Sequence, residues 1–165
     1  MRTPRRTQAV MVAIGLTLFV VAAGAWSGAL ATTPSGETAT PLARGAIDDP
    51  ANINRKVGDG SVRIRTAGAL DAVTVEITLA PGGTGGWHSH AGPLVTIVKQ
   101  GSLTLIDESC APREIDAGHA AILSGSTTKD ENRGTTPVTF DVTFLIPHDA
   151  ASPRVDEPAP SGCDA

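Results

Sequence analysis

Residues 82–101 read GGTGGWHSHAGPLVTIVKQG and hold the densest group of chemically active side chains in the sequence. In an extended strand His88 and His90 are two positions apart, so both imidazoles leave the same face, with Cα atoms roughly 6.8 Å apart. Because a bond from zinc to an imidazole nitrogen is only about 2.1 Å long, two rings at this separation can converge on one ion. The alternative is a metal-free pair of neutral imidazoles, hydrogen-bonded to each other, to water or to an anion, in a pocket sensitive to pH.

Segments with a period of two surround this histidine pair. Residues 71–80 and 138–146 alternate, with apolar side chains on one face and Thr, Glu or Asp on the other. Shorter strands, separated by glycine-rich turns, are expected at residues 61–65, 87–90, 94–99, 103–107, 113–115 and 120–123. Many short strands at this spacing, with no long helical period after residue 42, indicate an all-β sandwich or small barrel.

The histidine segment resembles the first motif of the cupin family, whose members are double-stranded β-helix (jelly-roll) barrels. That motif sets a Gly, a His-x-His, a Glu and a second Gly at fixed spacing, and this sequence supplies Gly82, His88, His90 and Gly101. Leu94 stands where the Glu is expected, so one carboxylate ligand of metal-binding cupins is absent and the pocket becomes more apolar. More narrowly, the segment is similar to small exported single-domain bacterial cupins, whose biochemical role is generally unassigned. The resemblance covers about residues 42–150.

The second cupin motif lacks its histidine ligand. Counting from Gly118 places Lys129 at the histidine position, and a shift of one residue places Thr128 there. Asp130 or Glu131 could turn inward and complete a site of two histidines and one carboxylate, as in non-haem iron oxygenases. The charged segment around them looks more like a solvated turn. Two histidines alone would bind iron, manganese or zinc weakly, because these ions take more protein ligands.

The first 31 residues are expected to be an export signal or a membrane anchor. A basic stretch at residues 1–8 precedes an apolar run at residues 9–26, and Ala-Leu-Ala at 29–31 fits a cleavage site. As a helix, 18 residues rise roughly 27 Å and nearly cross a bilayer, so an uncleaved N-terminal anchor helix stays open as the alternative. In both cases the rest of the chain is expected outside the cytoplasmic membrane, extracellular or in the cell envelope.

The remaining chain reads as one domain with two flanking segments. Residues 32–41, rich in Thr, Pro and Ser, indicate a linker; residues 42–150 form the expected barrel; residues 151–165 form a proline-rich tail. Outside the cytoplasm Cys110 and Cys163 are expected to form a disulfide that holds this tail against the barrel. Two independent thiols are the alternative.

Charge and composition limit the possible partners. Without residues 1–31 the chain has 10 basic and 17 acidic residues, a net charge of −7, and aromatic residues make up only 3% of the sequence. Nucleic acid is therefore not expected as a partner, because neither a basic face nor stacking platforms are available. We expect an exported module that binds an unknown small molecule or has an accessory role. The alternative implied by the resemblance is a metal-dependent dioxygenase or isomerase with His88 and His90 as ligands. The resemblance also makes a homodimer plausible.

Overall fold

The structure is a computed structural model that describes residues 30–164. The predicted export signal or anchor helix lies outside the described residues except for its last two positions. Within residues 30–164 no helix is long and apolar enough to cross a membrane. All regular elements there are strands: β1 (Ser35–Ile47), β2 (Asn52–Val57), β3 (Gly60–Arg65), β4 (Leu70–His90), β5 (Leu94–Gln100), β6 (Ser102–Asp107), β7 (Pro112–Asp116), β8 (Ala120–Leu123), β9 (Thr128–Glu131), β10 (Val138–Pro147) and β11 (Arg154–Asp156).

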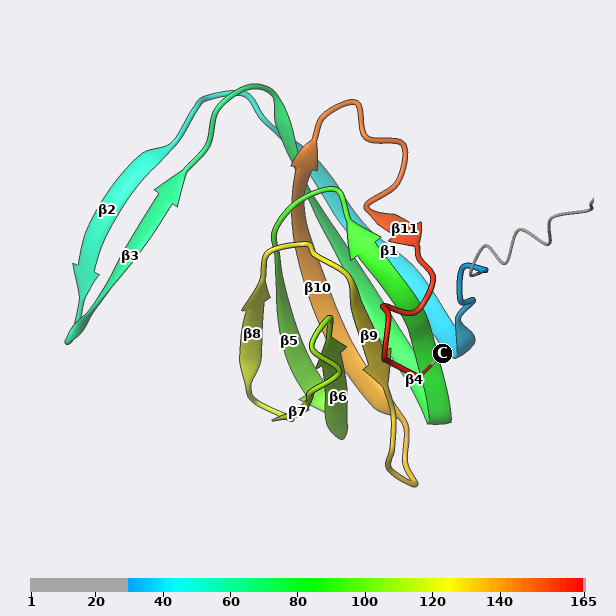
Figure 1. The fold of residues 1–165 in the computed structure, drawn as a ribbon. Coiled ribbons are helices and arrows are strands. Elements are labelled where there is room, and N and C mark those ends of the chain that lie inside the picture. The colour runs from blue at the N-terminus through cyan, green and yellow to red at the C-terminus, as the bar shows by residue number, and fades with distance from the viewer. Residues whose placement is uncertain (1–29, 165) are drawn as a thin grey trace, which may run out of the picture.

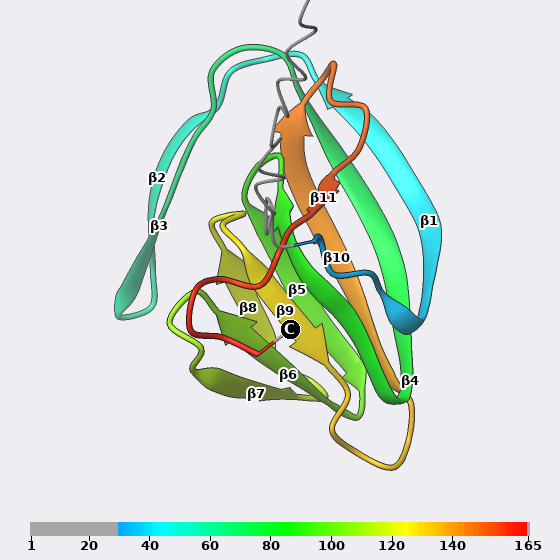
Figure 2. The same cartoon turned by 45° about the vertical axis from the view of Figure 1, so that its right-hand side comes forward.

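Nine of these strands form one curved antiparallel sheet with two walls, and the long strand β4 belongs to both walls (Figures 1 and 2). The first half of β4 pairs with β1 and β10, and its second half pairs with β9 and β11. Gly82 and Gly86 have φ angles of 72° and 67°, and the register shifts between Thr84 and Gly86. Such a bulge bends a strand and requires residues that tolerate positive φ, so the glycines carry β4 from one wall to the other. The segments predicted separately at 71–80 and 87–90 are thus one strand.

The interior between the walls is apolar. Along β10, Val138, Phe140, Val142, Phe144 and Ile146 are all buried, and the residues between them are partly exposed. This is the alternation that the sequence predicts, and it confirms the all-β barrel.

The linker predicted over residues 32–41 is wrong for residues 35–41, which belong to β1. This segment pairs with β4 from Glu37, opposite Leu79, to Pro41, opposite Val75. Its Thr, Pro and Ser residues resemble a linker because β1 lies at the edge of the sheet and is mostly exposed. The register shift after Pro41 accommodates a residue that has no backbone N–H to donate.

Residues 153–164, here called the strap, lie across the second half of β4. The Glu157 N–H donates to the Trp87 carbonyl at 2.8 Å, and the Trp87 indole Nε1 donates to the Asp164 carbonyl at 2.8 Å. A disulfide joins Cys163 to Cys110, with Cα atoms 5.4 Å apart, which confirms the predicted pairing. Trp87, only 1% exposed, packs on the outer side of β4, covered by the strap.

Candidate functional site

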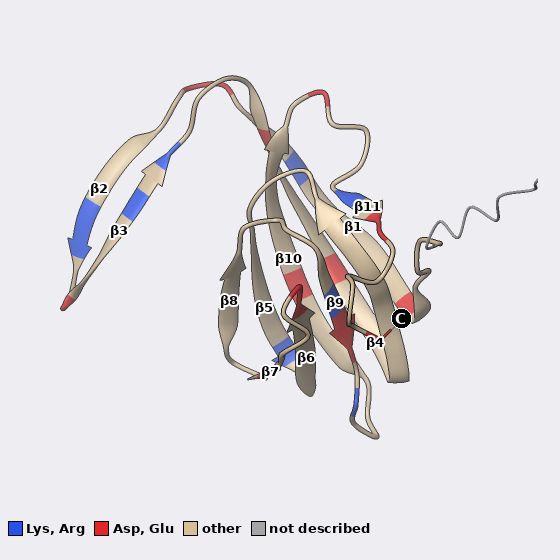
Figure 3. Cartoon of the chain, viewed as in Figure 1, with Lys and Arg blue, Asp and Glu red and all other residues tan. Residues whose placement is uncertain are grey.

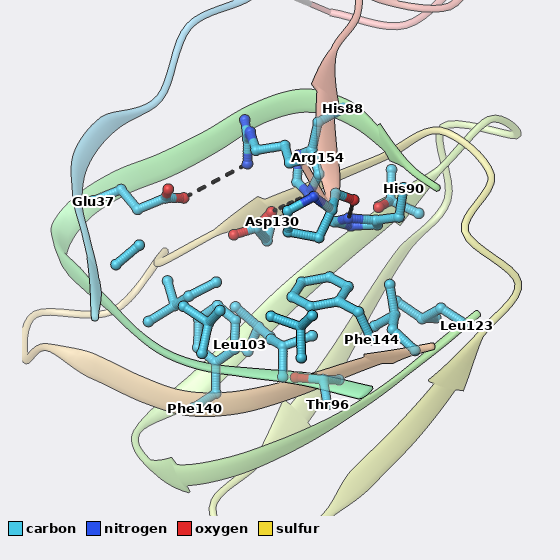
Figure 4. A pocket seen from close by; sticks show the side chains of 18 of the residues that line it. Glu37, His88, His90, Thr96, Leu103, Leu123, Asp130, Phe140, Phe144 and Arg154 are labelled. Carbon is cyan, nitrogen blue, oxygen red and sulfur yellow. Dashed lines mark hydrogen bonds and ion pairs between the residues drawn. The ribbon is translucent and has the colours of Figure 1, made fainter. Parts of the chain in front are cut away.

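A cavity of about 290 Å³ lies between the two walls of the barrel and is partly open (Figure 4). Apolar side chains line most of it: Val73, Val75, Ile77, Leu94, Leu103, Leu105, Leu123, Phe140, Val142 and Phe144. Five ionisable side chains lie together on the opposite side, contributed by β1, β4, β9 and β11: Glu37, His88, His90, Asp130 and Arg154. We call these five the polar side of the cavity.

His88 and His90 both project into the cavity from the end of β4, as their two-residue spacing predicts. Their ring centroids are 4.8 Å apart in an edge-to-face arrangement. Nδ1 of His88 lies 2.8 Å from the Gly86 carbonyl, and Nδ1 of His90 lies 3.1 Å from the Pro153 carbonyl. Because a carbonyl only accepts, each Nδ1 carries the proton.

Burial keeps both imidazoles neutral. It lowers the pKa of each from 6.5 to about 4, assisted at His88 by the positive charge of Arg154 and at His90 by the neighbouring His88. A neutral ring with its proton on Nδ1 has a free lone pair on Nε2. Each histidine therefore offers the cavity a hydrogen-bond acceptor that can also serve as a metal ligand.

Asp130 lies beside His88 and points inward from β9. Its Oδ1 is 3.4 Å from Nε2 of His88, and the residue is 5% exposed. Gly85 makes room for it, because a Cβ at that position would lie 2.5 Å from Asp130 Oδ1. Burial raises the pKa of the Asp130 carboxyl from 3.8 to about 6, against the opposing charge of Arg154.

The solvated charged turn predicted around Asp130 is wrong, because residues 128–131 form strand β9 between β4 and β6. Thr128 and Asp130 face the cavity, whereas Lys129 and Glu131 lie on the other side of the strand. Glu131 pairs with Lys129 at 3.0 Å and with Arg133 at 2.8 Å, so it is not part of the polar side.

Arg154 and Glu37 complete the polar side and were not expected from the sequence. Arg154 donates through Nη2 to the Gly85 carbonyl and through Nε to Asp156 at 2.7 Å. Its Nη1 lies 3.9 Å from Glu37 Oε2, and that buried oxygen has no hydrogen-bond partner. Burial and the nearby Asp130 raise the pKa of Glu37. The two residues come from the apparent linker and the apparent tail, and only the folded sheet brings them together.

Leu94 and the two other histidines of the chain, His119 and His148, fall in different places. Leu94 lines the cavity at the position of the missing cupin Glu and is 3% exposed. His119 is exposed, and His148 pairs with Asp71 at 2.7 Å away from the cavity. Within residues 30–164 no three His, Cys, Asp or Glu side chains are placed closely enough to hold a metal ion.

No protein-family model matches the chain, and no curated protein is similar to it. Among solved structures it is similar to a cupin domain from Bordetella pertussis, with 18% identity over 69% of this chain and 96% of that one (TM-score 0.46). It is also similar to the Cupin_2 domain of an XRE family transcriptional regulator from Enterobacter cloacae, with 19% identity over 46% of this chain and 80% of that one (TM-score 0.40). A third similar structure is an oxalate oxidase, with 21% identity over 47% of this chain and 46% of that one (TM-score 0.41).

The assignment of the fold rests on the molecule's own geometry. The cavity lies between the two walls of an antiparallel barrel, and the His-x-His pair at the end of β4 points into it. The protein is an all-β antiparallel barrel, as the alternating strand pattern of the sequence predicts, and its His-x-His pair faces the cavity.

Proposed function

We propose that the barrel binds a small, largely apolar molecule whose polar group donates hydrogen bonds or carries a positive charge. The observation that carries this proposal is a largely apolar cavity with acceptors gathered on one side. A volume of about 290 Å³ is near the lower end of small-molecule pockets, which are roughly 300–1,000 Å³.

The polar side favours a donor because most of its free groups accept. Nε2 of His88 and Nε2 of His90 are acceptors, since each Nδ1 proton is bound to a backbone carbonyl. The Asp130 carboxylate and the unpartnered Glu37 Oε2 also accept. Leaving such buried acceptors without a donor costs roughly 1–3 kcal/mol each, so a ligand that supplies donors gains affinity.

Charge supports the same ligand class. Two carboxylates, Glu37 and Asp130, face one guanidinium, and Arg154 already contacts the Gly85 carbonyl and Asp156. An anionic ligand would meet both carboxylates in a poorly hydrated site, where like charges repel strongly.

We expect n-octylamine to bind at pH 7.5 at least ten times more tightly than octanoate, with 1-octanol between them. The three probes share one apolar chain, so isothermal titration calorimetry on the purified protein measures the effect of the polar group. Asp130→Asn should reduce the advantage of the amine several-fold, because it removes a carboxylate from the cavity. Glu131→Gln is the matched control, since it removes the adjacent carboxylate outside the cavity.

Two results would contradict this proposal. If none of the three probes binds, the cavity is not a binding site for small apolar molecules. If octanoate binds as tightly as the amine, Arg154 rather than the acceptors selects the ligand.

A second candidate function is that of a metal-dependent enzyme of the dioxygenase or isomerase type. It is favoured by the tautomer of the two rings, because metal-bound histidines generally donate their other N–H to a carbonyl or carboxylate. His88, His90 and Asp130 would be the ligands, and an iron, manganese or zinc ion would supply Lewis-acid or redox chemistry. These donors suit such ions, but side chains must move to converge on one.

Under this second function, His88→Ala and His90→Ala each reduce tightly bound metal at least tenfold. Plasma mass spectrometry on the protein, purified without added ions, measures the metal content per chain. His119→Ala, at an exposed histidine, is the control and should change nothing. Unchanged metal in both cavity variants, or less than about 0.1 ion per wild-type chain, rules this site out.

A further inference from the structure

The hairpin formed by β2 and β3 stands apart from the barrel (Figures 1 and 2). Its six residue pairs, from Asn52–Arg65 to Val57–Gly60, form a separate two-stranded sheet. Every residue of both strands is exposed. Since an isolated hairpin is only marginally stable in water, an extended arm of this kind requires a surface to pack against.

One face of the hairpin is mostly apolar, with one charged residue, Arg55, opposite Val62. Residues opposite each other in an antiparallel pair share a face, so the register places Ile53, Val57, Val62 and Ile64 together. Their side chains remain 43%, 60%, 46% and 42% exposed, respectively. The other face is polar and basic, with Lys56, Ser61 and Arg63 among its residues. An exposed, mostly apolar face of this kind is typical of an interaction surface.

The barrel has a matching uncovered surface on the outer side of β5 and β8. Val95 and Ile97 on β5 and Ile122 on β8 point outward and are 37%, 50% and 79% exposed. A cleft of about 660 Å³ lies between this surface and the hairpin, with Val62 and Ile64 on one side and Val95 and Ile122 on the other. The hairpin therefore does not cover the outer face of its own barrel.

The hairpin and the rest of the described chain have net charges of opposite sign. Residues 52–65 have four basic residues and one acidic residue, a net charge of +3. The rest of residues 30–164 has six basic and sixteen acidic residues, a net charge of −10. Figure 3 shows the basic residues of the hairpin well separated from the acidic residues of the barrel. A basic arm is attracted to an acidic body, including that of another copy.

We propose that the β2–β3 hairpin docks on the outer face of β5 and β8 of a second copy of this chain, whose own hairpin docks in return. A two-fold axis makes the contact reciprocal, so one dimer covers both apolar arms and both apolar barrel faces. A second copy supplies both an apolar face of the right kind and a body of opposite net charge to the hairpin. This inference is independent of the ligand that the cavity binds.

Sedimentation equilibrium of the purified protein tests the proposal with two adjacent substitutions on opposite hairpin faces. Val62→Glu places a carboxylate among the apolar side chains of this face, opposite Arg55, and should weaken self-association at least tenfold. Ser61→Glu introduces the same side chain on the polar face and should weaken it much less. Ile122→Glu, on the barrel face, should act like Val62→Glu. A monomer at 100 µM wild-type chain, or equal effects of Val62→Glu and Ser61→Glu, would overturn the proposal.

Mixing and cross-linking identify the occupant of the barrel face. A mixture of the Val62→Glu and Ile122→Glu variants retains one intact contact per dimer, so it should associate more tightly than either variant alone. In the double variant Val62→Cys/Ile122→Cys, mild oxidation should give a covalent dimer on a non-reducing gel. A cross-link within one chain would show that the arm folds onto its own barrel, and it would overturn the proposal.

Discussion

Breaking the Cys110–Cys163 disulfide is expected to lower the free energy of unfolding by about 4 kcal/mol. The bond closes a loop across a sequence separation of 53. In the chain-entropy account, closing a loop of that size lowers the conformational entropy of the unfolded chain and so raises its free energy by about this amount. Cys110→Ser/Cys163→Ser, measured by urea unfolding against the wild-type chain, gives the value directly. Adding a reductant to the wild-type chain should reproduce it, and adding it to the double variant should have no further effect.

The same substitution should loosen the strap. The strap covers Trp87 and supplies the Pro153 carbonyl that fixes the His90 ring, together with Arg154 on the polar side. Because the chain contains only one other Trp, Trp26, a Trp26→Phe background isolates the emission of Trp87. We expect this emission to shift to longer wavelength in the folded double variant, and octylamine to bind it several-fold more weakly. A loss of less than about 1 kcal/mol with unchanged emission would mean that backbone pairing alone holds the strap.

The parts of the fold that local patterns determine could be predicted from the sequence. Strand β10 alternates strictly because one face meets the interior and the other does not, and burial of every second residue follows. The inward direction of His88 and His90 follows from the same period of two. The disulfide was predictable from the expected oxidising compartment, although the spacing of the cysteines alone does not require it.

The polar side of the cavity was not predictable in the same way, because it depends on contacts between distant segments. Asp130 and Lys129 are adjacent charged residues, which suggests a solvated turn. In the fold Lys129 packs 5.4 Å from the Trp87 ring centre, and Asp130 occupies the space left by Gly85. Glu37 and Arg154 likewise reach the cavity only because β1 and β11 pair with β4. Pairing between strands that are far apart in the sequence leaves no periodic pattern from which it could be predicted.

Asp130→Asn is expected to stabilise the protein by about 3 kcal/mol at pH 8. Burial raises the pKa of the carboxyl from 3.8 to about 6, so the folded state binds this proton more tightly than the unfolded state does. Stability therefore falls as the pH rises from 3.8 to 6. Above that range the ionised carboxylate destabilises the folded state by the equivalent of about two pKa units, roughly 3 kcal/mol. Asparagine has nearly the same shape and no charge, so it removes this cost. At pH 5 the gain should fall to roughly half, as measured by urea unfolding at both pH values.

Glu131→Gln is the control for this prediction and should have the opposite sign. Hydrogen bonds from Lys129 and Arg133 lower the pKa of Glu131, so its carboxylate stabilises the folded state near neutral pH and its removal should destabilise it. A loss of stability in Asp130→Asn at pH 8 would contradict the prediction, because it would mean that a cation already neutralises the Asp130 carboxylate. Such a loss, if abolished by a chelator, would favour the metal-dependent function over the binding of an amine. Whether Asp130→Asn stabilises or destabilises the protein at pH 8 thus distinguishes the binding of an amine from the metal-dependent function.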